Sequence, residues 1–339
     1  MQILVVNQVE VEALLSMEAC MALMERALAA LAAGAALAPL RSIMWLPGRL
    51  GALGTMPAYV DWLGTFGAKI ISVFPGNYGT EFDAHQGAVV LFEATHGRPV
   101  AFVDATAVTA IRTAAVSGVA TEHLAREDAG DLALLGSGTQ ARTHLEAMRV
   151  ARPLRRVRVW SRTQAHAVRF ARAEGSRWNL PIEVAPTARD AVEDADLICT
   201  TTAAAEPILH GEWISPGAHI NAVGSSVPSA RELDAVAVAR SRLFVDRRES
   251  ALREAGDFLL ARGEGRIGDD HICGEIGEVI LGRVPGRTAP GEITLFKSVG
   301  LGIEDVAAAH HVYTRALETG AGVRVTLGGG HGERNVGRK

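Results

Sequence analysis

One stretch constrains the fold more than any other. The apolar run Asp131–Leu135 leads directly into a Gly-x-Gly-x-x-Ala turn, and a helix-forming segment follows. A strand, a tight turn and a helix N-terminus in this order form a binding turn for a dinucleotide pyrophosphate. Gly136 permits the turn, Gly138 lets the backbone approach the anion, and Ala141 lets the helix pack on the strand. With a second strand at Val157–Trp160, we predict nucleotide binding over an ordinary strand–helix turn.

The end of the second strand bears on the choice of cofactor. NAD-binding sites of this type carry an Asp or Glu about 20 residues past the glycine turn, where it binds the ribose 2′-hydroxyl. No carboxylate occurs from Val157 to Thr163, and Ser161 and Arg162 stand at the strand end instead. Arg162 with the two hydroxyls suits a 2′-phosphate. The pattern favours NADP(H) and leaves NAD(H) possible, with a plain surface arginine as the alternative for Arg162.

Composition limits the class of protein. The 339 residues suffice for two domains, and a net charge of −4, from 34 basic and 38 acidic residues, gives no basic field for nucleic acid. Cys20, Cys199 and Cys273 show neither a disulfide framework nor a zinc spacing, which favours a reducing compartment and no metal site. There is no signal-peptide pattern and no apolar run near ~18 residues. We expect a soluble cytoplasmic protein that binds neither nucleic acid nor a membrane.

The segments before the glycine turn change pattern twice. Val9–Ala33 has apolar residues at helical spacing and predicts one or two helices. Short apolar runs between Gly and Pro then predict the strands of a meander or a strongly curved sheet. Asp104–Leu124 returns to helical spacing and leads into the nucleotide-binding part. The strands predicted between the two helical regions are Ser42–Leu46, Ala52–Tyr59, Thr65–Phe74, Ala88–Phe92 and Val100–Val103.

After the second strand, apolar runs alternate with helix-length segments. This alternation predicts an α/β fold with a mostly parallel, doubly wound Rossmann sheet. A last helix is expected at Ile303–Gly320, and the tail Gly328–Lys339 is expected to be frayed. The further predicted strands are Ile182–Ala185, Leu197–Thr200, Ile220–Val223, Leu243–Val245 and Ile293–Phe296.

Three basic residues lie in apolar surroundings in the first part of the chain. Lys69 interrupts an apolar strand, Arg112 lies among small apolar residues of a helix, and Arg41 opens the strand region. A buried cation is costly unless it is paired or used. Each residue alone is compatible with a snorkelling or salt-bridged side chain. Together, beside a nicotinamide site, they predict a clamp for a carboxylate, with Lys69 and Arg112 as the candidate catalytic residues.

Weaker candidates come from loops. His85 precedes a predicted strand and is a possible proton donor, although a structural loop histidine is the alternative. Ser225 and Ser226 follow the fifth strand of the nucleotide-binding part. Ligands of doubly wound sheets bind at the carboxyl ends of the strands, which is the reason to consider these serines.

Nearly the whole chain resembles the ornithine cyclodeaminase/mu-crystallin family. The stretches that carry the resemblance occur in the family's order, and as a set they are far more specific than the glycine turn alone. They are Gly67-Ala68-Lys69, His85-Gln86-Gly87, Leu91-Phe92, Asp104-Ala105, Thr109 to Ala115, Gly136 to Ala141, Trp160 to Thr163, Ala222 to Ser225, Phe296 to Gly300 and Glu304-Asp305.

The resemblance implies a homodimer in which each subunit has two domains. Residues 1–115 with 306–339 would bind substrate and dimerise, and residues 116–305 would form the Rossmann domain. Arg41, Lys69 and Arg112 would hold the substrate carboxylate. The stretch Ser161-Arg162-Thr163 is similar to that of the NADPH-binding mu-crystallins. The residues implied to line the dinucleotide are Thr113, Gly136, Ser137, Gly138, Thr139, Gln140, Val223 and Ser298.

Two departures from the family pattern bear on the reaction. Ornithine cyclodeaminases have an acidic residue where Gly54 stands and a catalytic Asp where Ser226 stands, and both acids serve a diamine substrate. The resemblance therefore implies hydride transfer between a nicotinamide and the α-carbon of an α-imino or α-amino acid, with Ser226 beside the substrate. The alternatives are an ornithine or lysine cyclodeaminase and a non-enzymatic, mu-crystallin-like protein that binds NADPH and a small ligand.

Overall fold

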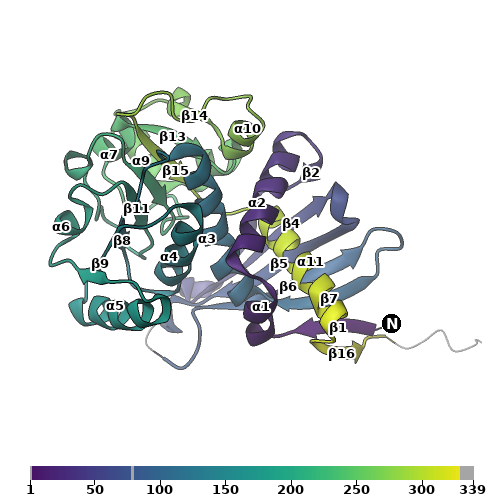
Figure 1. Ribbon diagram of the computed structural model, residues 1–339. Coiled ribbons are helices and arrows are strands. Elements are labelled where there is room, and N and C mark those ends of the chain that lie inside the picture. Colours follow the sequence, from purple (N-terminus) through teal and green to yellow (C-terminus); the bar gives the residue numbers. More distant parts are fainter. Residues whose placement is uncertain (1, 78–79, 329–339) are drawn as a thin grey trace, which may run out of the picture.

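The computed structural model describes residues 2–77 and 80–328 of the chain, and in these residues the strands form two eight-stranded sheets (Figure 1). The expected tail falls outside this range from residue 329 onward. Helices cover both sheets, and one long helix lies between them (Figure 1).

The first sheet is largely antiparallel. Its four central strands, β4 to β7, pair in sequence order as a meander, which confirms the prediction from the short apolar runs. β1 adds to β7 in parallel and β16 adds to β1, so that both ends of the described chain meet at one edge. β1, β2 and β16 were not predicted. The strands are β1 (Gln2–Val6), β2 (Ala36–Leu37), β3 (Ser42–Trp45), β4 (Ala52–Val60), β5 (Thr65–Val73), β6 (His85–Glu93), β7 (Pro99–Asp104) and β16 (Val323–Thr326).

Three helices cover one face of this sheet: α1 (Gln8–Leu14), α2 (Met17–Ala32) and α11 (Gly302–Thr319) (Figure 1). α1 and α2 are separate because Ser16 caps the second helix by accepting a hydrogen bond from the backbone N–H of Ala19. Both helices and α11 were predicted. α11 packs on β4, β5 and β6 although it is encoded far along the chain.

The second sheet is parallel at every pair of strands, which confirms the predicted Rossmann-type arrangement. Its order is β10-β9-β8-β11-β12-β15-β13-β14, and the winding direction reverses between β8 and β11. Ligands of such sheets bind at this reversal, beyond the carboxyl ends of the strands. The strands are β8 (Asp131–Leu135), β9 (Arg156–Trp160), β10 (Ile182–Val184), β11 (Leu197–Thr200), β12 (His219–Ala222), β13 (Ser241–Val245), β14 (Ile272–Glu275) and β15 (Ile293–Lys297).

Short and long helices connect these strands on both faces (Figure 1). β14 was not predicted, and the predicted strand that includes Val223 ends one residue earlier, at Ala222. The connecting helices are α4 (Thr139–Ala151), α5 (Gln164–Trp178), α6 (Ala188–Val192), α7 (Ala235–Arg240), α8 (Arg248–Glu254), α9 (Gly256–Gly263) and α10 (Ile276–Ile280).

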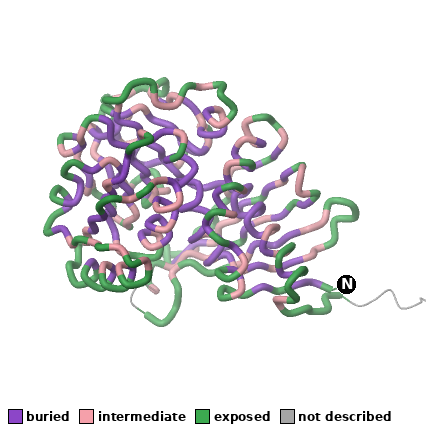
Figure 2. The backbone as a smooth tube through the Cα atoms, in the orientation of Figure 1, coloured by how far each residue is buried: buried purple, intermediate pink, exposed green. Residues whose placement is uncertain are grey.

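Helix α3 (Ala105–Leu124) joins the two halves of the molecule. It is buried along most of its length and packs against α2 and β6 on one side and α4, β12 and β15 on the other (Figure 2). The domain boundary expected between residues 115 and 116 falls inside this continuous helix. Among residues 2–77 and 80–328, no helix combines the length and the apolar character needed to cross a membrane.

The centre of the parallel sheet should dominate stability. Leu134 in β8 is fully buried, so we expect Leu134→Ala to lower the free energy of unfolding by about 2–5 kcal/mol through lost burial and a cavity. Urea denaturation at a fixed protein concentration measures this loss. Val168→Ala on the exposed side of α5 is the control and should change stability by less than about 0.5 kcal/mol. Equal losses of stability in the two variants would contradict a dominant contribution from the centre of the parallel sheet.

Candidate active site

The glycine turn between β8 and α4 has the backbone that a dinucleotide turn needs. The N–H of Gly136 donates to the carbonyl of Trp160 at 2.8 Å, and Gly136 has a φ of 127°. A Cβ at Gly136 would lie 2.6 Å from Oγ1 of Thr201, so a side chain there is excluded. A Cβ at Gly138 would meet no atom within 4 Å. The space in front of the turn is therefore open at the N-terminus of α4, where an anion is favoured.

A hollow of about 480 Å³ lies on one side of this turn. Ser137, Gly138 and Thr139 line it together with basic side chains from α4 and α5. These basic residues are Arg142, His166 and Arg169. Their charge suits phosphate groups. Sequence reasoning missed all three, although Arg142 stands in the first turn after the glycine motif and is visible there.

The stretch Ser161-Arg162-Thr163 follows β9, the strand beside β8. It therefore lies at the same edge of the sheet as the glycine turn. Arg162 is exposed and forms no ion pair with any residue that the structure describes. It does not line the hollow at the turn. The structure thus leaves the Arg162 side chain free at the strand end.

A second hollow, of about 330 Å³, lies on the other side of the turn. Thr139 lines this hollow as well as the first one. The remaining lining residues come from β5, β6, α3 and the segment before β6, and they include Ile71, His85 and Thr109. His85 is the first residue of β6. A ligand that extends across the turn can therefore reach from the basic hollow into this one.

Lys69 and Arg112 lie next to the second hollow and share one acidic partner. The Lys69 Nζ atom is 3.3 Å from Oγ1 of Thr109 and 3.0 Å from a carboxylate oxygen of Asp305. Arg112 donates through Nε to Asp305 at 2.9 Å and through Nη1 to Glu304 at 2.5 Å. Lys69 and Arg112 are 3% and 4% exposed, and both acids are fully buried. The predicted pair of buried cations is thus brought together, in contact with two buried carboxylates.

Local structure explains this arrangement. Side chains of β5 alternate between the faces of the sheet, and Lys69 is on the face that α3 and α11 cover. Arg112 lies in the first half of α3, and Glu304 and Asp305 occupy the first turn of α11. The two acids were part of the sequence match, but no role was predicted for them.

Burial sets the protonation of this cluster. Burial lowers the pKa of Lys69 to about 8, with Asp305 opposing the shift. Burial also acts against the charge of Arg112, but Asp305 and Glu304 outweigh it, and the pKa of Arg112 lies above its ordinary value. The pKa of Glu304 is raised to about 7 by burial, against the attraction of Arg112. Burial, and then the charge of Lys69, lower the pKa of His85.

Arg41 joins the cluster through the loop that follows β15. Its Nη2 atom donates to the carbonyls of Val299 and Gly300, and its Nε atom lies 2.9 Å from a carboxylate oxygen of Glu254. Gly300 has a φ of 82°, and a Cβ there would lie 2.7 Å from Nη1 of Arg112. The backbone at residues 299–300 therefore separates Arg41 from Arg112. All three predicted clamp residues lie around one region, although Arg41 is less buried than the other two.

Buried acids fix the loops at the carboxyl ends of the strands. Asp246, at the end of β13, accepts hydrogen bonds from the N–H groups of Val299 and Gly300. Glu232 accepts from the N–H of Gly224 at 2.7 Å and from the N–H of Thr202 at 2.6 Å. The loops held in this way carry or adjoin three of the predicted residues, Val223, Ser226 and Ser298. Sequence reasoning missed both acids.

The remaining candidates differ in their burial. Thr113 follows Arg112 on α3 and is buried, and Ser298 is buried between β15 and the 299–300 loop. Ser225 donates to the carbonyl of Ala230 and thereby closes its own loop. Ser226 is half-buried, and within the described chain no hydrogen bond joins its side chain to Lys69, Arg112 or Arg41.

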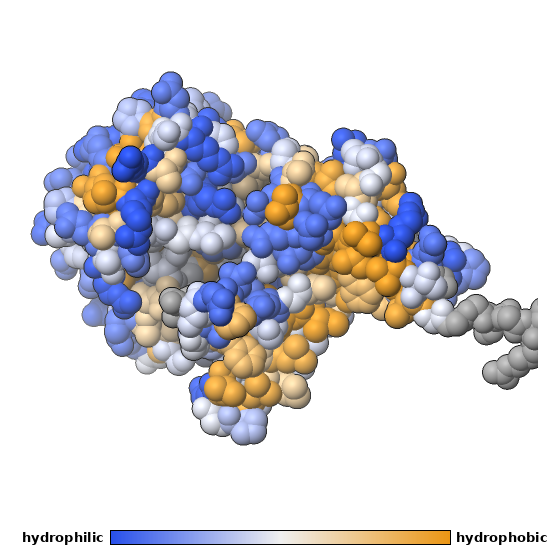
Figure 3. Space-filling view, turned by 90° about the horizontal axis from the view of Figure 1, so that it is seen from below, coloured by the Kyte–Doolittle hydropathy of each residue, from blue (hydrophilic) through white to orange (hydrophobic). Residues whose placement is uncertain are grey.

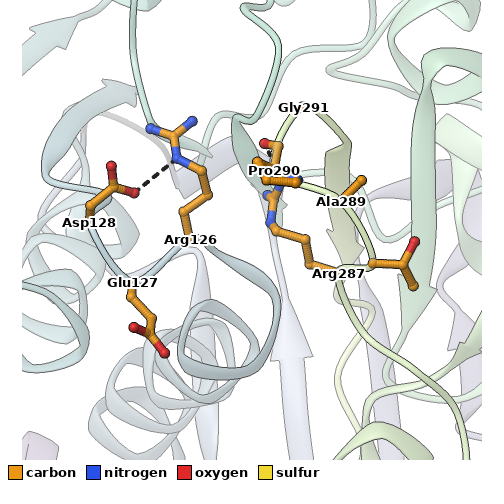
Figure 4. Close-up of a pocket in the computed structure, with 8 residues that line it drawn as sticks. Arg126, Glu127, Asp128, Arg287, Ala289, Pro290 and Gly291 are labelled. Atoms are coloured by element: carbon orange, nitrogen blue, oxygen red, sulfur yellow. Dashed lines mark hydrogen bonds and ion pairs between the residues drawn. The ribbon is translucent and has the colours of Figure 1, made fainter.

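A larger hollow of about 820 Å³ lies at the opposite edge of the parallel sheet. It is formed by the segments that precede β8 and β15, Arg126–Asp128 and Arg287–Gly291 (Figure 4). Arg126 is bound by Asp128 and by Asp196, and Arg287 donates to backbone carbonyls such as that of Leu124. This hollow lies at the amino ends of the strands, so it is a poor candidate for the cofactor site.

Known proteins resemble this chain over most of its length. The chain is 40% identical over 280 residues to the ketimine reductase mu-crystallin of Mus musculus, which covers 83% of this chain and 85% of that protein. It is 37% identical to a Δ1-pyrroline-2-carboxylate reductase of Thermococcus litoralis, solved in complex with NADH and L-proline; the TM-score is 0.93, over 95% of this chain and 100% of the other.

An archaeal alanine dehydrogenase, solved as a dimer with bound NAD, is 34% identical and has a TM-score of 0.91, over 96% of this chain and 100% of the other. A family model matches residues 1–320 of the chain. This range includes the glycine turn, the buried cations and the first turn of α11. The chain belongs to the ornithine cyclodeaminase/mu-crystallin family.

Proposed function

We propose that the protein is an NAD(P)H-dependent reductase of small α-imino acids, able to run in reverse as an amino-acid dehydrogenase. One observation carries the proposal: the buried cations Lys69 and Arg112 lie beside a hollow that shares Thr139 with the dinucleotide turn. A carboxylate held there lies next to a cofactor held by the turn. Relatives that are reductases of ketimines and of pyrroline-2-carboxylate support the same reaction class.

The glycine turn fits a dinucleotide. Gly136 excludes a side chain, the space at Gly138 is open, and the buried Oε1 atom of Gln140 has no hydrogen-bond partner among the described residues. When bound, the nicotinamide supplies the hydride. The residues of this chain bind and orient the cofactor. In this proposal the turn and α4 hold the pyrophosphate, and Thr113, Val223 and Ser298 border the path toward the second hollow.

The clamp would fix the α-carbon of the substrate. Asp305 holds Arg112 at Nε and Glu304 holds it at Nη1, so its Nη2 atom is the donor left for a substrate carboxylate. Lys69 adds a point charge that its pKa of about 8 keeps mostly protonated at pH 7. Arg41 approaches from the other side of residues 299–300. Because these groups are buried, their attraction for a carboxylate is stronger than in water. Holding the substrate at one end converts hydride transfer into a reaction between fixed partners.

Two positions without an acid favour substrates that lack a second amine. The second hollow has a mixed lining, in which Ile71, Phe82 and Ala84 are apolar and Asp83 is an acid. Gly54 and Ser226 stand where ornithine cyclodeaminases carry acids. We therefore favour cyclic ketimines and short open-chain imines over ornithine or lysine. A non-enzymatic binder of NADPH and a small ligand is the remaining alternative.

A panel of imines tests the reductase activity. We expect NADPH or NADH oxidation with at least one of pyrroline-2-carboxylate, piperideine-2-carboxylate, or pyruvate with ammonia or methylamine. Removing one partner of a buried, hydrogen-bonded charge pair costs about 2–5 kcal/mol, so Arg112→Ala and Lys69→Ala should each lower turnover by about 30-fold or more. Absorbance at the reduced nicotinamide band measures both effects.

The controls for this experiment separate chemistry from folding and from cofactor binding. Val168→Ala, on the exposed side of α5, should keep wild-type turnover. Cofactor titrations should show unchanged affinity in the Lys69 and Arg112 variants. A protein that binds the cofactor but oxidises it with no imine would be a binder and not a reductase.

We infer further that Arg162 favours NADP(H). The side chain is exposed, has no ion-pair partner among the described residues, and lies where the ribose of a dinucleotide lies in this type of sheet. No acid competes for the ribose hydroxyls between Val157 and Thr163. NAD(H) remains possible for this chain, because the solved relatives carry NADH or NAD.

Replacing Arg162 tests this preference. A charge-assisted contact to a 2′-phosphate is worth about 1.5–3 kcal/mol, so Arg162→Ala should weaken NADPH by about 10- to 150-fold and NADH far less. Ser161→Asp should repel the phosphate and favour NADH. Fluorescence titration of both cofactors measures this, with Arg172→Ala on α5 as the exposed-arginine control. Equal losses for both cofactors would show that Arg162 is a surface residue only.

We also propose a homodimer formed through the outer face of the first sheet. Hydrophobic residues gather on this half of the molecule (Figure 3). Phe66 and Ile70 of β5 point away from the helices and are exposed, and Phe66 stacks on Phe92 at 5.2 Å. Every residue of β3 is also exposed. A solvated sheet face normally carries polar side chains, so an apolar face favours contact with a partner surface.

In this proposal residues 1–115 and 306–339 form the dimerising part, and residues 116–305 form the Rossmann part.

A charge in the centre of this face should separate the subunits. In a two-fold interface, Ile70→Glu places two buried carboxylates near each other, so we expect a monomer. Light scattering coupled to size-exclusion chromatography measures the mass of the particle. Val168→Glu, which alters an exposed valine on α5, should stay dimeric. A wild-type monomer would refute the proposed interface.

A further inference from the structure

The buried cluster around the clamp contains more acid than base. Three cations, Arg41, Lys69 and Arg112, face four carboxylates, Asp246, Glu254, Glu304 and Asp305. A substrate carboxylate would be a fifth. In a buried region an uncompensated negative charge is costly. When the substrate binds, one of the four acids must therefore become protonated or move away from the cluster.

The resident acids differ in how strongly their charged form is held. Asp305 contacts both Lys69 and Arg112. Asp246 accepts three backbone N–H hydrogen bonds, from Arg247, Val299 and Gly300. Such donors stabilise a carboxylate. Glu254 is paired with Arg41. Burial raises the pKa of both Asp246 and Glu254, so their charged forms depend on these hydrogen bonds and on this ion pair.

Glu304 is the least supported of the four. One oxygen, Oε2, contacts Arg112, and the other, Oε1, is buried without a hydrogen-bond partner among the described residues. The side chain is fully buried. An unpaired buried carboxylate oxygen is unfavourable, whereas a protonated carboxyl needs fewer acceptor contacts.

The groups that face Glu304 come from every element packed around it. Arg112 of α3 attracts a negative charge there, while Asp305 of its own helix and Asp246 after β13 repel one. Cys20 of α2 also faces it and stays a neutral thiol, because burial raises its pKa. Lys69 of β5 acts through Asp305. The backbone of Leu301 also supports the charged form of Glu304. Among the described residues, the one cation that pairs with Glu304 is therefore Arg112, the residue to which a substrate carboxylate would bind.

We propose that Glu304 takes up a proton from solvent when a substrate carboxylate binds to Arg112, so that Glu304 compensates the charge of the incoming ligand. This inference rests on the carboxylate clamp of the proposed function. Glu304 is a positioning residue here, because it acts through Arg112 and does not itself hold the substrate.

The direction of the pH effect follows from the free protein. The pKa of Glu304 is raised to about 7 by burial, so the side chain is protonated at pH 6 and charged at pH 8. A bound ligand carboxylate weakens the contact between Glu304 and Arg112 and adds a negative charge beside it. Both effects raise the pKa of Glu304 further. Proton uptake on binding should be near zero at pH 6 and approach one proton at pH 8. Ligand affinity should then fall by up to about tenfold per pH unit above pH 7.

The test uses a ligand that cannot supply the proton itself. Pyrrole-2-carboxylate carries a carboxylate and a ring nitrogen that does not titrate near neutral pH. Calorimetric titration into the NADH-saturated protein, in buffers of different ionisation enthalpy, gives the protons taken up at pH 6 and at pH 8. Glu304→Gln mimics the protonated side chain, so most of the uptake at pH 8 should disappear and affinity should become independent of pH between 6 and 7. Any uptake that remains at pH 8 is that of Lys69, whose pKa is about 8.

Glu122→Gln is the matched control. Glu122 lies at the far end of α3 from Arg112, and burial raises its pKa as well. This variant should keep the wild-type uptake. The infrared difference spectrum of the wild type gives a second readout that needs no variant, because a new protonated-carboxyl band should appear when the ligand binds at pH 8.

Each outcome decides the matter. Undiminished uptake in Glu304→Gln would overturn the inference and point to Lys69, whose pKa of about 8 allows it to accept a proton. Binding without uptake or without the infrared band would also overturn it, even if the variant failed to fold. If neither pyrrole-2-carboxylate nor any imine binds the wild type, the carboxylate clamp itself is wrong.

Discussion

The contact of Asp305 with both Lys69 and Arg112 is the interaction on which the candidate site depends. It ties together three elements that are distant in the sequence: strand β5, the long helix α3 and the first turn of α11. A buried ion pair of this kind adds little net stability, but its geometry is specific because breaking either contact leaves a buried charge. The cluster therefore defines how the first sheet meets the helix that leads into the parallel sheet.

Local sequence signals were sufficient for much of the fold. Gly136 and Gly138 identified the turn and its strand, and the helical spacing of Val9–Ala33 identified α1 and α2. β1 and β16 were missed. β16 is exposed at every residue and is a strand only through its pairing with β1, and β1 lies between β16 and β7. β14 was missed because only its pairing with β13 in the second sheet makes it a strand.

The residues of the site differ in the same way: some have a local sequence signal and others do not. A cation in an apolar run is visible in one sequence, so Lys69 and Arg112 were found. Asp246 follows a strand, Asp305 opens a helix and Glu232 lies in a loop, and an acid is ordinary at each of these places. Their function in the site arises from contacts between segments more than fifty residues apart in two of the three cases. Such contacts have no local signature, which is why the acidic half of the cluster was not predicted from sequence.

The position of β15 has a consequence for synthesis of the chain. This strand lies between β12 and β13, so the middle of the parallel sheet is completed by residues 293–297. The helix that covers the first sheet, α11, is made later still. On a ribosome, neither half can reach its final packing until the last fifth of the chain has emerged. Until β15 has been made, β12 and β13 have no strand between them. Their exposed edges favour aggregation during this period.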